Sequence, residues 1–160
     1  MSVRLTPIEN PKSPLMKLAY WITKRKIGKV ITPLKTVYAR LPLGFALWSN
    51  KIKTLEKQLA IPEELALLIK IQVARLNGCH FCIDIGKAQA IGKFIKQERF
   101  FEVGTFEESA LFSLKEKLAL RFATELTLQK RVTDQTYSLC QQAFSEEELI
   151  GIAWAVGVEH

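Results

Sequence analysis

The chain has 160 residues, of which 48% are hydrophobic, and its formal net charge is +7. This length supports one domain with a substantial core and is too short for two ordinary ones. The odd cysteine count of three argues against a secreted disulfide scaffold. We find no signal peptide, and the longest uncharged stretch near the start, residues 41–50, is far shorter than the roughly 20 apolar residues that cross a bilayer. We therefore expect a soluble, cytoplasmic protein.

The basic charge is concentrated in the first 40 residues, which hold nine Lys and Arg residues against Glu9 as their one acidic residue. Three prolines oppose regular helix in the first fourteen residues. Residues 15–26 then show an amphipathic helical pattern, which Gly28 ends; its apolar side is formed by Leu15, Leu18, Ala19 and Ile22. We interpret residues 1–30 as a basic N-terminal arm on a helical domain that spans residues 31–160.

Such an arm either packs within an oligomer of its own chain, with its lysines in solvent, or contacts an anionic surface. Because no nucleic-acid-binding motif accompanies it, we favour the first alternative. We expect neither nucleic acid nor a membrane as a partner.

Apolar residues recur at helical spacing through the rest of the chain. The pattern predicts a short helix over residues 34–40, a longer one over 43–59 and a third over 63–76. The third is apolar almost all round, so we expect it to be the most buried helix. Asn77-Gly78 ends it, and the next helix continues to about Gly92.

The second half of the chain begins with an ambiguous segment, residues 94–101. Thr105-Phe106-Glu107-Glu108 has the spacing of a capping box and predicts the start of a long helix. A further helix is expected near residues 133–144, and a second capping box at residues 145–148 begins the last one. No segment has the period of a strand, so we predict an all-α fold and exclude the thioredoxin fold.

The most informative stretch is Cys79-His80-Phe81-Cys82, which stands directly after the Asn77-Gly78 break. This position places two thiols at the start of a helix, where unpaired backbone N–H groups favour a thiolate and lower its pKa below the usual value of about 8.5. The spacing also allows a disulfide. His80 adds positive charge beside the sulfurs, whereas Asp84 opposes the thiolate if it points inward.

Three interpretations of the cysteine pair are open. It is a redox-active dithiol, two structural cysteines, or half of a zinc site, for which the further ligands would come from His80, Cys140 and His160. We favour the dithiol, and we expect no cofactor and no metal. Cys140 lies in an apolar helical pattern and is expected to be a buried filler.

The motif and its surroundings are similar to the carboxymuconolactone decarboxylase superfamily on its alkylhydroperoxidase, or AhpD-like, side. The residues that carry the resemblance are Asn77 to Cys82 after an apolar helix, and later the segments 106–113 and 144–149. The resemblance covers about residues 30–158. It implies a single helical-bundle domain, assembly into a homo-oligomer (dimer, trimer or hexamer) and a dithiol that reduces peroxides.

The chain departs from the resemblance at the proton relay. Members with peroxidase chemistry have a glutamate twelve residues before the first cysteine and a histidine four after the second, where this chain has Leu67 and Gly86. Family chains also commonly run beyond the position of His160. We therefore expect a competent but slow dithiol, with His80 as the remaining proton carrier.

Two functions follow as hypotheses. The first is a thiol-dependent oxidoreductase in which Cys79 and Cys82 cycle between dithiol and disulfide, with a peroxide or other small oxidant and an external dithiol reductant as partners. The helix start favours Cys79 as the attacking thiol, whereas the resemblance favours Cys82. The second is a catalytically lapsed member that acts as a structural or binding oligomer.

Overall fold

The computed structural model describes residues 5–92 and 96–160, except for the side chains of residues 26–27, 45–50, 53, 88, 91–92 and 97. Its described elements are all helical, which confirms the all-α class. None of the described helices is both long and apolar enough to span a membrane. The chain divides into two compact units, Met1–Lys57 and Gln58–His160. The basic segment 1–30 lies in the first unit, and its role as a separate arm stays a prediction.

The first unit contains α1 (Pro14–Ile27), the short π-helix η1 (Leu34–Tyr38) and α2 (Pro42–Glu56). Gly28 ends α1 as expected, with a left-handed φ of 78° and its N–H donating to the carbonyl of Lys24. Phe45 and Trp48, two aromatic residues of α2, lie among the side chains that are not described.

The buried face of α1 differs from the one we expected. Ala19 is buried, but its neighbours in the small core are Met16, Tyr20 and Leu34, while Leu18 is 54% exposed. Tyr20 accounts for this different buried face, because its hydroxyl donates to the carbonyl of Ile8 at 2.7 Å and so ties the helix to the preceding segment. The hydrogen bond gives the buried tyrosine hydroxyl the polar partner that it needs.

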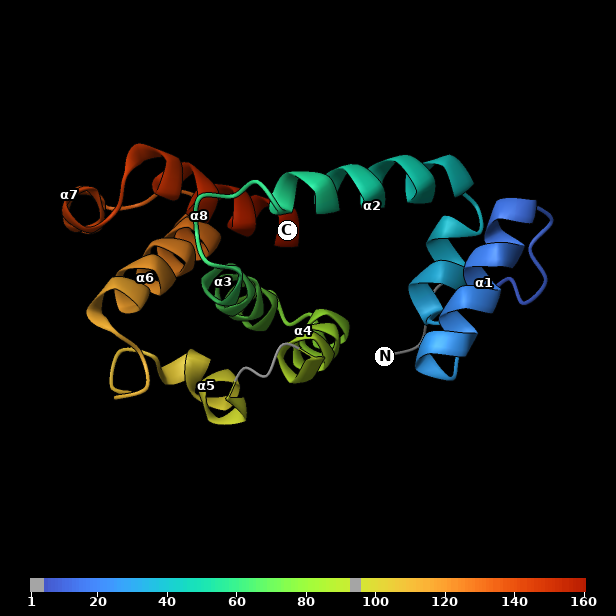
Figure 1. Ribbon diagram of the computed structural model, residues 1–160, viewed down its shortest axis with the longest axis horizontal. Coiled ribbons are helices and arrows are strands. Elements are labelled where there is room, and N and C mark those ends of the chain that lie inside the picture. Colours follow the sequence, from blue (N-terminus) through green and yellow to red (C-terminus); the bar gives the residue numbers. More distant parts are fainter. Residues whose placement is uncertain (1–4, 93–95) are drawn as a thin grey trace. The chain divides into compact units, whose positions relative to one another are not determined.

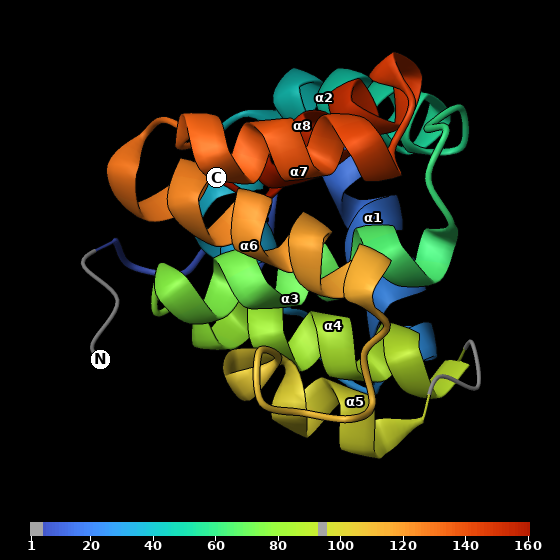
Figure 2. The same ribbon diagram turned by 90° about the vertical axis from the view of Figure 1, so that its left-hand side faces the viewer.

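The second unit is built around α3 (Glu63–Leu76), which packs against α4 (His80–Gly92), α6 (Leu114–Gln129) and α8 (Glu146–Glu159) (Figure 1). It has the largest set of buried residues among the described helices, as expected: Leu65, Leu67, Leu68, Ile69, Ile71, Gln72, Val73 and Ala74. The remaining elements are α5 (Gln97–Glu102), η2 (Val103–Thr105) and α7 (Asp134–Ala143). Figure 2 shows α7 and α5 at opposite ends of this unit.

The long helix of the second unit begins at Leu114 and not at Thr105, so this prediction was wrong. The hydroxyl of Thr105 donates to the carbonyl of Glu102, whereas the hydroxyl of Ser113 accepts the N–H of Glu116 in a complete capping box. Residues 106–113 instead form a loop that inserts Phe106 and Phe112 into the core. Burial of two aromatic rings outweighs the local capping signal.

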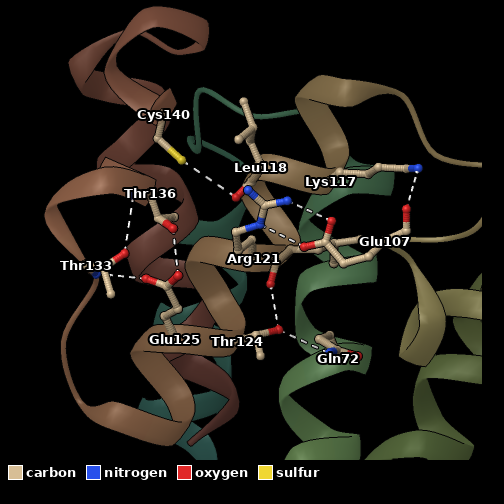
Figure 3. Close-up of polar contacts among 11 residues, drawn as sticks. Gln72, Glu107, Lys117, Leu118, Arg121, Thr124, Glu125, Thr133, Thr136 and Cys140 are labelled. Carbon is tan, nitrogen blue, oxygen red and sulfur yellow. Dashed lines mark hydrogen bonds and ion pairs between the residues drawn. The ribbon is translucent and has the colours of Figure 1, made fainter. Parts of the chain in front are cut away.

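This loop is fastened to α6 by charged groups (Figure 3). Glu107 accepts two hydrogen bonds from the Arg121 guanidinium, each 2.8 Å, and its carbonyl accepts a third from Lys117. The hydrogen bond from Arg121 holds the pKa of the Glu107 carboxyl below its usual value.

Cys140 on α7 is fully buried, as predicted, and its S–H group donates to the carbonyl of Leu118 at 3.6 Å (Figure 3). Burial, with a smaller contribution from Glu125, raises the pKa of this thiol to about 11. A thiol with so little thiolate at neutral pH is a poor nucleophile, so Cys140 serves packing.

Candidate functional site

The site lies where α3 ends and α4 begins. Gly78 adopts the left-handed φ of 66° that closes α3, and the N–H of Cys79 donates to the carbonyl of Ala74. The carbonyl of Cys79 then accepts the N–H of Ile83, and its sulfur accepts the N–H of Cys82 at 3.3 Å. Cys79 is therefore the N-cap of α4, and a thiolate on its sulfur would be stabilised by the helix start.

Cys82 is the partner of Cys79. The two sulfurs lie 2.02 Å apart, at disulfide-bonding distance, and the Cα atoms are 5.3 Å apart. Both residues are partly exposed, in contrast to the buried Cys140. The pair is thus open to reagents while the third cysteine is not.

A pocket of about 260 Å³ opens beside Cys82 between α3, α4 and the end of α8. Cys79 is not among its lining residues. Its apolar wall is formed by Leu67, Ile71, Phe81, Ile85 and Val158, together with Gly86. Its polar lining residues, apart from Cys82, are Lys70, Gln89 and Glu159. A small molecule placed here would lie beside Cys82.

The two relay positions both line this pocket, but they are filled by packing. Leu67 is 5% exposed and belongs to the main core. Gly86 is buried against Ile71, and a Cβ atom at Gly86 would lie 2.8 Å from Cγ1 of that residue. A histidine at position 86 therefore has no room unless Ile71 moves.

His80 and Asp84 are both exposed, and neither lines the pocket. His80 is the first residue of α4 and lies between the two cysteines in sequence. Within the described ranges no three His, Cys, Asp or Glu side chains gather as they would around a metal ion. The zinc interpretation therefore finds no support in this part of the chain.

Sequence reasoning missed Lys70 and Glu159 as residues of the site. Lys70 had a detectable signal, because it follows the relay position Leu67 by three residues on the same helix and so shares its face. Glu159 had none, since it comes from the last turn of α8. Its approach to α3 depends on tertiary packing, which also brings the side-chain amide of Asn77 to 3.4 Å from the His160 ring.

No family model matches the chain. It is 33% identical to the uncharacterised protein YdfG of Bacillus subtilis over 98 residues, which cover 60% of this chain and 67% of the relative. It is 25% identical to the uncharacterised protein YnjA of Escherichia coli over 142 residues, 88% of this chain and 78% of the relative.

Solved structures share the fold at lower identity. The apo debrominase Bmp8 superposes with a TM-score of 0.78 at 19% identity, over 99% of this chain and 86% of its own; a Bmp8 variant has also been solved in complex with 2,3,4-tribromopyrrole. A protein of unknown function from Agrobacterium tumefaciens, described as an AhpD antioxidant defence protein, superposes with a TM-score of 0.70 at 21% identity, over 77% of this chain and 86% of its own. A peroxidase-related protein from Silicibacter superposes with a TM-score of 0.73 at 16% identity, over 98% of this chain and 85% of its own.

Proposed function

The chain belongs to the same family as YdfG and has the AhpD-like fold of the carboxymuconolactone decarboxylase superfamily, and on this basis we propose that it is a thiol-dependent oxidoreductase that reduces hydroperoxides. The observation that carries the proposal is the pairing of Cys82, which lines a pocket of mixed apolar and polar side chains, with Cys79 at the helix start. A peroxidase-related and an AhpD-type neighbour support the same class of chemistry.

In the proposed cycle the Cys82 thiolate attacks the terminal oxygen of a hydroperoxide. An S–O bond forms, the O–O bond breaks, and the departing alkoxide takes a proton to become an alcohol. The Cys79 thiolate then attacks the sulfenic sulfur of Cys82, and the expelled hydroxide takes a proton to become water. The pocket favours Cys82 for the first step, and the helix start favours Cys79 as the thiolate of the second.

An external dithiol reduces the Cys79–Cys82 disulfide and leaves as its own disulfide, which completes the cycle. His80 is the proposed proton carrier on this solvent-facing side, because it is exposed and lies between the two cysteines in sequence. We expect His80→Gln to slow reduction of the disulfide several-fold and to raise the pH at which the thiols react. An unchanged rate and pH profile would remove His80 from the mechanism.

Thiol counting tests the proposed function directly. We expect the reduced chain to lose two of its three thiols on treatment with one equivalent of tert-butyl hydroperoxide, and Cys140→Ser to behave the same way apart from its missing thiol. Cys82→Ser should not react, whereas Cys79→Ser should stop at a sulfenic acid that dimedone traps. Retention of all thiols in the wild type would contradict the proposal. We expect weaker turnover than in relatives that keep both relay groups.

The alternative is a lapsed member that acts as a structural or binding oligomer, and the apolar packing at Leu67 and Gly86 favours it. It predicts thiols that survive hydroperoxide while the chain remains folded and assembled. We propose a homo-oligomer under either function; light scattering that returns a mass near 18.2 kDa across a dilution series would exclude it. Because one neighbour is a debrominase, a brominated pyrrole is the second substrate to test in the same thiol count.

A further inference from the structure

The pocket beside Cys82 contains one cationic residue among its lining side chains, Lys70 of α3. Lys70 is partly buried and stands one helical turn after Leu67. Residues three apart on a helix share a face, and the four-carbon stem of lysine carries its ammonium group beyond the backbone position from which it starts. Lys70 therefore lines the same pocket as the two relay positions and Cys82.

We propose that Lys70 takes over the part of the missing relay in this pocket: its ammonium group stabilises the Cys82 thiolate and protonates the departing alkoxide. This inference rests on the hydroperoxide chemistry proposed above. An ammonium group beside a thiolate favours the charged form of the sulfur by direct attraction. It also supplies a proton where neither Leu67 nor Gly86 can.

The proton in this step comes from Lys70, and the oxidant is the hydroperoxide itself. As the Cys82 sulfur bonds to the terminal peroxide oxygen, the O–O bond breaks and the alkoxide takes one proton from the Lys70 ammonium. The neutral amine regains a proton from water before the next turnover. The two electrons that the sulfur loses are returned later by the external dithiol.

The other charged group of the pocket, Glu159, has a different effect. Its carboxylate opposes a nearby thiolate by charge repulsion. The other charged or histidine side chains on the adjoining helices do not line the pocket; they are Glu63, Glu64 and Arg75 on α3, His80, Asp84 and Lys87 on α4, Glu98, Arg99 and Glu102 on α5, Glu146, Glu147 and Glu148 on α8, and His160 after α8. Lys70 is therefore the group whose removal should change both the protonation of Cys82 and the fate of the alkoxide.

Three variants of the full chain separate these two roles from a general effect of charge. Lys70→Gln removes both the charge and the proton. Lys70→Arg keeps the charge but holds its proton too tightly to donate it readily. Lys87→Gln is the matched control, because it removes the same charge from exposed α4 surface outside the pocket.

The measurement is the second-order rate of thiol loss with tert-butyl hydroperoxide between pH 5 and pH 10. For Lys70→Gln we expect a loss of about tenfold at pH 7 and a pH profile displaced upward by about one unit, the lower end of the effect of a nearby opposite charge. Lys70→Arg should restore the position of the profile but not its plateau. Lys87→Gln should match the wild type.

The possible failures are distinct. If Lys70→Gln matches both Lys87→Gln and the wild type while the wild type still forms its disulfide, the role of Lys70 is wrong and the proposed function stands. If the wild type keeps its thiols at every pH, the proposed function fails and the role of Lys70 fails with it. Should Lys70→Gln unfold, Lys70→Met, which keeps an apolar stem, replaces it with the same expected results.

Discussion

Gly86→Ala tests whether the relay position on α4 is closed by packing. The added Cβ atom would lie 2.8 Å from Cγ1 and 3.5 Å from Cδ1 of Ile71, a residue that is only 2% exposed. Carbon atoms pack best at about 3.5–4.0 Å, so Ile71 or the whole of α4 must move by roughly 0.7 Å. The atom that must move is an inner methylene carbon of a buried side chain, and α3, which carries it, lies at the centre of the unit.

Two opposing terms set the magnitude. Replacing a helical glycine by alanine stabilises by about 0.5–1 kcal/mol when nothing obstructs the methyl group, and overpacking a close-packed core costs about 1–3 kcal/mol. Gly157 on α8 supplies the first term alone, because a Cβ atom there meets nothing within 4 Å. We therefore expect Gly157→Ala to be stabilising and Gly86→Ala to be destabilising by about 1 kcal/mol.

Urea unfolding of the two variants measures both terms, with the free energy extrapolated to water and the slopes compared. The expected difference between the variants, about 1–3 kcal/mol, is the steric contribution at Gly86. Ile71→Ala should reverse the sign of the Gly86→Ala effect in a double-mutant cycle, since it removes the obstructing atom. If Gly86→Ala stabilises as much as Gly157→Ala, the position has room and the absence of the relay histidine needs another explanation.

Three further outcomes follow from the fold. The pKa of Glu107 is lowered in the folded chain, so its stabilising contribution is present above pH 4.5 and is lost as the pH falls through the depressed value; Glu107→Gln should lose a few tenths to about 1 kcal/mol at pH 7 and progressively less as the pH is lowered below 4.5, as urea titrations across this range would show. Ser113→Ala should destabilise by about 1 kcal/mol and Thr105→Ala by much less, because only the first removes a helix cap; equal effects would contradict the observed helix start. Cys140 should resist iodoacetamide at pH 8 in the native chain, where about one thiol in a thousand is ionised, and react once urea unfolds it, as mass spectrometry of its peptide can show.

The sequence predicted the helices whose boundaries are set by neighbouring residues. The helix over 63–76 ends where Asn77-Gly78 breaks it, and the last helix begins at the capping box of Ser145, as expected. The sequence prediction failed where a local signal competed with burial. Thr105 has the right spacing for a helix cap, but burial of Phe106 and Phe112 in the core stabilises the chain more. The choice between two possible caps depends on packing that a local pattern does not contain.

The same limit applied to the site. The motif identified Cys79 and Cys82, because their chemistry depends on a helix start that the Asn77-Gly78 break already marks. The pocket beside Cys82 could not be predicted from a local sequence pattern, since its walls come from α3, α4 and the end of α8.

Close packing accounts for the apolar residues at both relay positions. At Gly86 the two helices approach so closely that Ile71 occupies the space of a side chain, and at Leu67 a carboxylate would be buried in the core. A buried carboxylate is disfavoured in its charged form, and Leu67→Glu would also remove apolar packing from the core. Neither relay group can therefore be introduced without disturbing this packing. Besides Cys82, the titratable residues that line the pocket are Lys70 and Glu159, and we propose that proton transfer at Cys82 uses Lys70.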